Sequence, residues 1–147
     1  MSLRELYQEM ILDHGKQPRN YGALLDANHI RMGHNPLCGD RLILYVNEQD
    51  GLVKDLRFEG TGCAISMASA SLMTEAVKNK SVAEINTLFQ QFHLLVTAGN
   101  PPEIELGKLA VFSGVVEFPI RVKCATLAWH TLKAALDNND PDPASTE

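Results

Sequence analysis

The chain has 147 residues, a hydrophobic content of 45%, a charged content of 21% and a formal net charge of −5. These values are typical of one globular domain that can bury a core without the support of disulfides or a structural metal. The negative charge and the lack of a lysine and arginine cluster argue against nucleic acid as a partner. With no signal-peptide pattern and no apolar run near the roughly 20 residues of a membrane helix, we expect a cytoplasmic protein with no membrane contact.

The first predicted element is an amphipathic helix from Ser2 to His14. Apolar side chains recur along it with the spacing of one helical face. Ser2 and Glu5 match a capping box at its start. Gly15 is expected to end the helix, and Pro18 to prevent its continuation.

Three strands are predicted next, over 29–34, 41–47 and 52–59. In the last of them, Leu52, Leu56 and Phe58 alternate with charged side chains. Asp50-Gly51 lies between the second and third strands and is a strong turn signal. These two strands are therefore expected to form an antiparallel hairpin.

The sequence after the third strand is predicted to be helical. Helical spacing runs from 63 to 78, and a capping box of Ser81 and Glu84 opens the next helix. Gly99, followed by two prolines, is expected to break that helix.

The last predicted helix begins at Pro119, which suits a first helical turn, and carries Cys124 on its apolar face. A short apolar segment over 106–112, expected to end at Gly114, precedes it. The tail over 138–147 is rich in Pro, Asp and Ser and is expected to be disordered. Residues 1–137 are then expected to form a single domain.

Each of the three cysteines has a distinct setting. Cys38 lies in the turn Asn35-Pro36-Leu37-Cys38-Gly39-Asp40, where it has little core to pack against. Cys63 follows two glycines at a helix start, where free N–H groups and the helix dipole stabilise a thiolate. With no secretory signal in the sequence, the thiols are expected to be free, metal-bound or reactive. Three thiolates and the Asp40 carboxylate would form a tetrahedral set that suits zinc or an iron–sulfur cluster.

Each of these residues also has an ordinary explanation. Free cysteine is among the most buried residue types, and for Cys124 on its apolar face that explanation alone is favoured. An aspartate in a turn commonly bonds the nearby backbone, which would account for Asp40. The cysteines form no C-x-x-C pair, so their spacing decides nothing.

Four stretches of the chain resemble the IscU-like family of iron–sulfur cluster assembly proteins. They are the opening from Leu6-Tyr7 to Gly22, the turn over 35–40, the segment over 58–71 and the segment over 121–125. The resemblance covers nearly the whole chain apart from the tail. It implies an α+β fold, in which a small three-stranded antiparallel sheet packs against several helices. It also implies a site at one end, formed by the three cysteines and Asp40.

Two departures within the resemblance point to one branch of that family. Lys123 precedes Cys124 where the scaffold branch has a histidine, and Phe118 to Val122 stand where that branch has a Leu-Pro-Pro-Val-Lys chaperone-recognition sequence. The segment between Cys63 and Cys124 is also longer than in the scaffold branch. These features resemble the SufU-type branch, whose members accept sulfur from a SufS-type cysteine desulfurase and depend on zinc.

The resemblance then implies roles for individual residues. Cys38, Asp40, Cys63 and Cys124 are expected to bind Zn²⁺, and Cys38 to accept the persulfide sulfur for downstream iron–sulfur assembly components. Arg121, which could steady Asp40 or the leaving thiolate or simply lie at the surface, and Lys123 are candidate neighbours of the ligands. None of the five histidines lies beside a site cysteine in sequence; His34 is near Cys38 and is expected at a strand end.

Two other functions share the same ligands. In one, the chain is a non-enzymatic scaffold on which a transient [2Fe–2S] cluster is assembled and passed to apo-proteins. In the other, zinc is purely structural and the protein is an adaptor. Lys123 and the long segment before Cys124 favour the sulfur acceptor.

Overall fold

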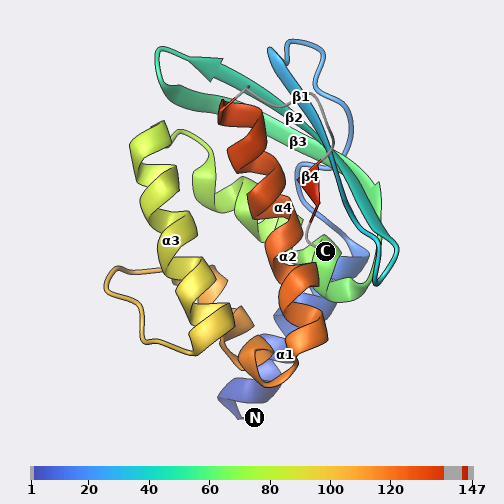
Figure 1. The fold of residues 1–147 in the computed structure, drawn as a ribbon, viewed down its shortest axis with the longest axis vertical. Helices are drawn as coiled ribbons and strands as arrows, with labels where there is room; N and C mark the ends of the chain where they lie inside the picture. Colours follow the sequence, from blue (N-terminus) through green and yellow to red (C-terminus); the bar gives the residue numbers. More distant parts are fainter. Residues whose placement is uncertain (1, 138–143, 146–147) are drawn as a thin grey trace.

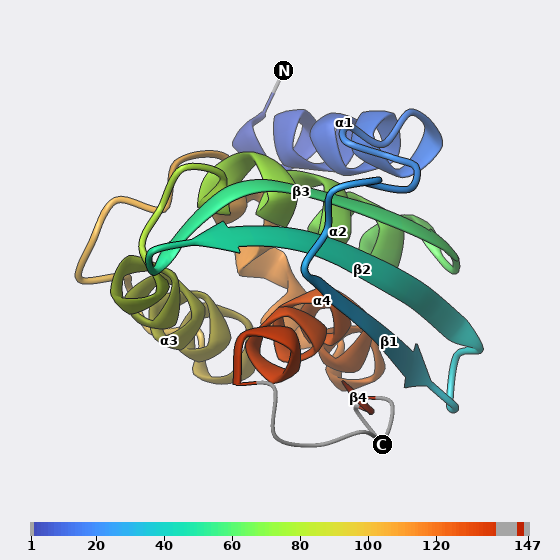
Figure 2. The same ribbon diagram turned by 90° about the horizontal axis from the view of Figure 1, so that it is seen from above.

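The computed structural model describes residues 2–137 and 144–145. Its elements are α1 (Leu3–Lys16), β1 (His29–Asn35), β2 (Asp40–Gln49), β3 (Leu52–Thr61), α2 (Ala64–Val77), α3 (Val82–Ala98), the 3₁₀ helix η1 (Gly107–Glu117), α4 (Pro119–Asp137) and β4 (Ala144–Ser145). The α2 and α4 helices pack against the curved sheet, and α1 packs against α2 (Figures 1 and 2). No helix of the described residues is long and apolar enough to cross a membrane.

The three predicted strands are confirmed and pair antiparallel in the order β3-β2-β1. Asp50 and Gly51 form the predicted hairpin turn, with φ of 54° and 78°. Two consecutive positive φ values match the turn that best fits the twist of a two-residue hairpin. The expected α+β fold, a small antiparallel sheet covered by helices, is therefore what the chain adopts.

Leu52 does not share the buried face of Leu56 and Phe58 in the third strand. Val53 is fully buried there, whereas Leu52 is half-buried. The pairing register shifts between Asn47 and Glu48, and a bulge of this kind reverses the alternation of the strand beyond it. Leu56 and Phe58 lie on the other side of the shift, where the pairing with β2 is regular, and both are fully buried.

Gly15 does not end the first helix, which continues to Lys16. A Cβ at Gly15 would lie 3.1 Å from the Cα of Ala64, so this glycine lets α1 approach the start of α2 closely. The helix ends where Pro18 prevents another turn. Ser2 caps the helix as predicted, because its hydroxyl accepts the N–H of Glu5.

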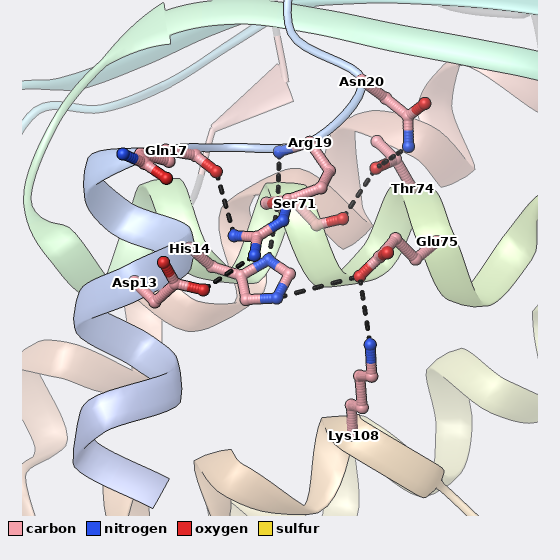
Figure 3. Close-up of polar contacts among 9 residues, drawn as sticks. All are labelled: Asp13, His14, Gln17, Arg19, Asn20, Ser71, Thr74, Glu75 and Lys108. Carbon is pink, nitrogen blue, oxygen red and sulfur yellow. Dashed lines mark hydrogen bonds and ion pairs between the residues drawn. The ribbon is translucent and has the colours of Figure 1, made fainter.

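A buried polar network fastens α1 and the following loop to α2 (Figure 3). His14 is only 3% exposed, and its Nδ1 lies 2.7 Å from the Ser71 hydroxyl, which also accepts the N–H of Arg19. Since Ser71 accepts from Arg19, its own proton is available for His14 Nδ1. Glu75 lies 3.8 Å from the other ring nitrogen of His14.

The segment before the last helix is longer and more regular than predicted. Gly114 lies inside η1, which extends to Glu117 because Val115 is also buried. This segment thus contributes side chains to the core. The capping box of α3 and the break at Gly99, which has a left-handed φ of 71°, are confirmed.

The end of the chain is described only at Ala144 and Ser145. These two residues form β4, which pairs parallel with β1 at Gly33 and His34. The other residues of the predicted disordered tail lie outside the described part of the chain, so that expectation stays a prediction.

Candidate metal centre

The turn that carries Cys38 is closed by the sheet on both sides. Asn35 ends β1 and pairs with Asp40, the first residue of β2. The N–H of Gly39 donates to the Asn35 carbonyl over 2.9 Å, and Gly39 adopts a φ of 73°, which favours glycine. The turn therefore holds Cys38, half-buried, at the end of a hairpin.

Cys63 is the N-cap of α2. Its sulfur accepts the N–H of Ser66 over 3.4 Å, as the sequence predicted for a cysteine at a helix start. Its backbone N–H donates to Asp40 Oδ1 over 3.0 Å. The helix start and the Cys38 turn thus meet at the Asp40 carboxylate.

Cys124 completes the group from the buried face of α4. Its sulfur lies 3.4 Å from that of Cys38. One ligand atom each from Cys38, Asp40 and Cys124 lie within 4.8 Å of one another. The Cys63 sulfur borders this group through a hydrogen bond with Cys124. Four residues that are distant in sequence are therefore neighbours in the fold.

The thiols at the centre share protons. A hydrogen bond from Cys124, aided by the Ser66 amide, lowers the pKa of Cys63 to about 6 in spite of its burial. The pKa of Cys124 is raised, first because its proton is held by Cys63 and then because the thiol is buried. Cys63 is thus the thiolate of the pair, and Cys124 the thiol.

Arg121 and Lys123 differ in their relation to the site. A hydrogen bond to Cys124, followed by the charge of Cys63, raises the pKa of the exposed Arg121 guanidinium. Lys123 is half-buried, and no hydrogen bond or ion pair joins its ammonium to the group within the described ranges. His34 lies half-buried on β1, opposite Arg41, and is not among the grouped residues.

The donor set fits a soft or borderline cation. Asp40 is fully buried, and no cationic side chain of the described residues makes an ion pair with it. A buried carboxylate without a cation is costly, and the thiols beside it would add further negative charge once they are deprotonated. Sulfur-rich tetrahedral sets of this type hold zinc or iron–sulfur clusters.

Two further residues contact the centre, and the sequence motifs alone did not single out either of them. Asn35 is fully buried and donates to Asp40 Oδ2 over 3.3 Å and to the Cys124 sulfur over 3.7 Å. A Cβ at Gly62 would lie 2.5 Å from Asp40 Oδ1. Both occur in the quoted motifs, but only the folded contacts distinguish them from ordinary turn residues.

The chain is similar to known proteins over the stretch that contains the residues of the centre. The pattern of the NifU-like N-terminal domain family matches residues 6–125. The zinc-dependent sulfurtransferase SufU of Bacillus subtilis is 42% identical over 133 residues, covering 90% of each chain. The iron–sulfur cluster assembly scaffold protein IscU of Thermotoga maritima is 43% identical over 136 residues, covering 92% of this chain and 96% of that one.

A solved structure agrees with both the fold and the family. It is from Fervidobacterium islandicum, and is described as a candidate iron–sulfur cluster assembly scaffold protein for the SUF system. It superposes with a TM-score of 0.83 at 32% identity, covering 92% of this chain and 99% of that one. The chain belongs to the NifU-like N-terminal domain family, the family of these IscU and SufU proteins.

Proposed function

We propose that this protein acts in iron–sulfur cluster assembly as a zinc-dependent sulfur acceptor for a SufS-type cysteine desulfurase in the cytoplasm. The supporting observation is the convergence of Cys38, Asp40 and Cys124 within 4.8 Å, with Cys63 beside them. Zinc, when bound to these four residues, would keep the thiols deprotonated at neutral pH. The relationship to SufU of Bacillus subtilis supports the same assignment.

Hydrogen bonding to the sulfurs favours Cys38 as the acceptor. The Ser66 amide donates to Cys63, and the Asn35 amide donates to Cys124. Among the residues that the structure describes, no N–H group donates to the Cys38 sulfur, which lies 3.4 Å from the Cys124 sulfur. An N–H donor withdraws charge from a thiolate and holds it in place. With all three thiols deprotonated by a bound metal, Cys38 would therefore be the sulfur whose charge is least withdrawn by hydrogen bonds.

The surroundings of Cys38 support an encounter with another protein. Leu37 and Ile120 are apolar but 66% and 67% exposed. Leu37 adjoins Cys38 in sequence, and the Ile120 carbonyl lies 3.9 Å from the Cys124 sulfur. Exposed apolar side chains at the mouth of a site are typical of a docking surface.

The transfer itself is a thiol–disulfide exchange. The thiolate of Cys38, one of the residues that would hold the zinc, attacks the outer sulfur of the desulfurase persulfide. A new S–S bond forms on Cys38 as the S–S bond of the desulfurase breaks, and the desulfurase cysteine departs as a thiolate. Arg121, which contacts the cysteine group, can stabilise negative charge there. The persulfide on Cys38 would then pass its sulfur to downstream assembly components.

A scaffold for a [2Fe–2S] cluster is the second candidate. The 43% identity with IscU of Thermotoga maritima over nearly both whole chains favours it, and the same four residues would be the ligands. Metal analysis separates the two. Protein purified without added iron is expected to contain about one zinc per chain, with no visible absorption band of an iron–sulfur cluster.

The first prediction tests the acceptor directly. After incubation with a cysteine desulfurase and cysteine, the extra sulfur is expected on Cys38 by peptide mass spectrometry. Cys38→Ser should abolish the transfer, because a hydroxyl is a poor nucleophile toward a persulfide. Leu25→Ser, at a fully exposed side chain, serves as the control and should transfer sulfur normally. Finding the sulfur on Cys124 with Cys38 unmodified would favour the scaffold.

A further inference from the structure

Asn35 lies within the candidate metal centre although its side chain is a poor ligand for zinc. It is fully buried at the end of β1. Its amide nitrogen donates to Asp40 Oδ2 over 3.3 Å and to the Cys124 sulfur over 3.7 Å. Its amide oxygen accepts the N–H of Leu37 over 3.3 Å. Both ends of the side chain are therefore engaged.

The two amide protons of Asn35 connect candidate ligands from different elements. Asp40 begins β2, whereas Cys124 lies in the second turn of α4. One planar amide group thus fixes the position of a carboxylate relative to a sulfur on another element. Groups that hold metal ligands in this manner set their orientation and basicity.

The contacts of Asn35 complement those of the Cys63 backbone. The Cys63 N–H donates to Asp40 Oδ1, and Asn35 donates to Oδ2, so both carboxylate oxygens are held. No hydrogen bond joins Asn35 to Cys38 in the described part of the chain. Asn35 therefore bonds two of the four proposed ligands directly, whereas it holds the proposed acceptor only through the backbone of the neighbouring Leu37 and Gly39.

We propose that Asn35 is a positioning residue that holds Asp40 and Cys124 as the retained ligands while Cys38 detaches. This inference rests on the proposed function, in which Cys38 must leave the metal. Departure of one ligand keeps the metal only if the other three hold their geometry. The N–H donor on Cys124 also withdraws charge from that sulfur, so sulfur transfer is directed to Cys38.

The test compares Asn35→Ser and Asn35→Ala with the parent chain by zinc competition against a chromophoric chelator. Serine can still accept the Leu37 N–H in the turn, but it is too short to reach Asp40 or Cys124. Both variants are expected to bind zinc about 10–100-fold more weakly, the range for lost contacts to metal ligands. Thermal melts of the metal-free forms check that the fold persists.

Two further measurements distinguish positioning from support of the turn. In a Cys38→Ser background, Asn35→Ser should weaken zinc binding as much as in the parent, because Asn35 does not act through Cys38. In an Asp40→Ala background the effect should shrink, since one of its two contacts is already gone. With Co²⁺ as the probe, loss of the N–H donor to Cys124 should move the sulfur-to-metal charge-transfer band to longer wavelength.

Parental zinc affinity and an unshifted Co²⁺ band in Asn35→Ser would overturn the inference, as would an effect that disappears in the Cys38→Ser background. These results would leave the proposed function standing if Cys38→Ser and Asp40→Ala still weaken zinc binding. Zinc affinity unaffected by Cys38→Ser and Asp40→Ala would sink the proposed function and this inference together.

Discussion

At the scale of single residues, the Asp40 carboxylate is the point where the centre is assembled. It is buried at the start of β2 and receives a backbone donor from Cys63 and a side-chain donor from Asn35. The Asn35 donor comes from the other end of the same turn and the Cys63 donor from the start of α2, so the turn and the fold orient the carboxylate together. A buried anion held by two neutral donors retains net charge, and that charge favours a cation beside it.

Gly62 lies so close to Asp40 that a side chain there would displace the carboxylate. A Cβ would lie 2.5 Å from Oδ1, the oxygen that accepts the Cys63 N–H. Gly62→Ala is therefore expected to weaken zinc binding by about tenfold or more, measured by chelator competition. Gly114→Ala is the matched control, since a Cβ at Gly114 would meet no atom within 4 Å. Equal zinc affinity in the two variants would contradict the steric role of Gly62.

At the scale of elements, sequence periodicity predicted which segments are helices and strands, but their ends depended on tertiary contacts. Gly15 has the chemistry of a helix stop, yet it serves the approach of α1 to Ala64. Leu52 follows the alternation of its strand, yet the register shift across β2 and β3 moves Val53 inward instead. Neither a neighbouring helix nor a bulge leaves a local signal in the sequence.

The centre was predictable only in part for a similar reason. The ligand candidates Cys38, Cys63 and Cys124 stood out because of their residue type and because their motifs resemble a known family. Asn35 and Gly62 act through distances of a few ångströms to residues on other elements, which no spacing in the sequence reveals.

The packing of α1 on α2 provides a pH-dependent contribution to stability through His14. Burial, followed by the charge of Arg19, lowers the pKa of His14 below its ordinary value of 6.5, while Glu75 and Asp13 oppose and Lys108 adds to the shift. The folded protein therefore binds fewer protons than the unfolded chain once the pH falls below about 6.5. This contribution is fully present above that pH and is lost as the pH falls toward the lowered value.

We expect the melting temperature of the metal-free protein to fall as the pH is lowered from 7.5 to 5.5. His14→Gln should flatten that fall, because glutamine has no proton to gain. The pKa of His130 is also lowered, by burial and by the charges of His93 and Lys133, so the His14→Gln, His130→Gln double variant should flatten the fall further. Parallel curves for parent and variants, measured by calorimetry, would argue against this assignment.

At the scale of the whole molecule, the hydrophobic core extends well beyond the candidate centre, which it adjoins at the buried Cys124. The core is built by side chains of the sheet, α2, α3, η1 and α4 that pack between the layers, and its largest members include Trp129, Phe58, Phe92 and Phe112. The centre lies where the β1–β2 turn, the start of α2 and α4 meet. A metal there would tie three elements together without being needed to bury the core.

Removal of zinc should therefore destabilise the protein without unfolding it. In a zinc finger, which lacks a core, binding of the metal supplies essentially all of the folding energy. Here the loss is expected to be partial, because the core remains when the ligands are released. Each kcal/mol of lost stabilisation should lower the melting temperature by about 2–4 °C in a domain of roughly this length.

Calorimetry with and without a strong chelator measures this shift, and released zinc is quantified in the same sample. In Asp40→Ala, which lacks one proposed ligand and the charge that attracts the cation, the chelator should lower the melting temperature less than in the parent. Lys54→Ala, at an exposed side chain of β3 away from the centre, should respond as the parent does. A melting temperature unchanged by the chelator, with no zinc released, would contradict the assignment of this centre to zinc.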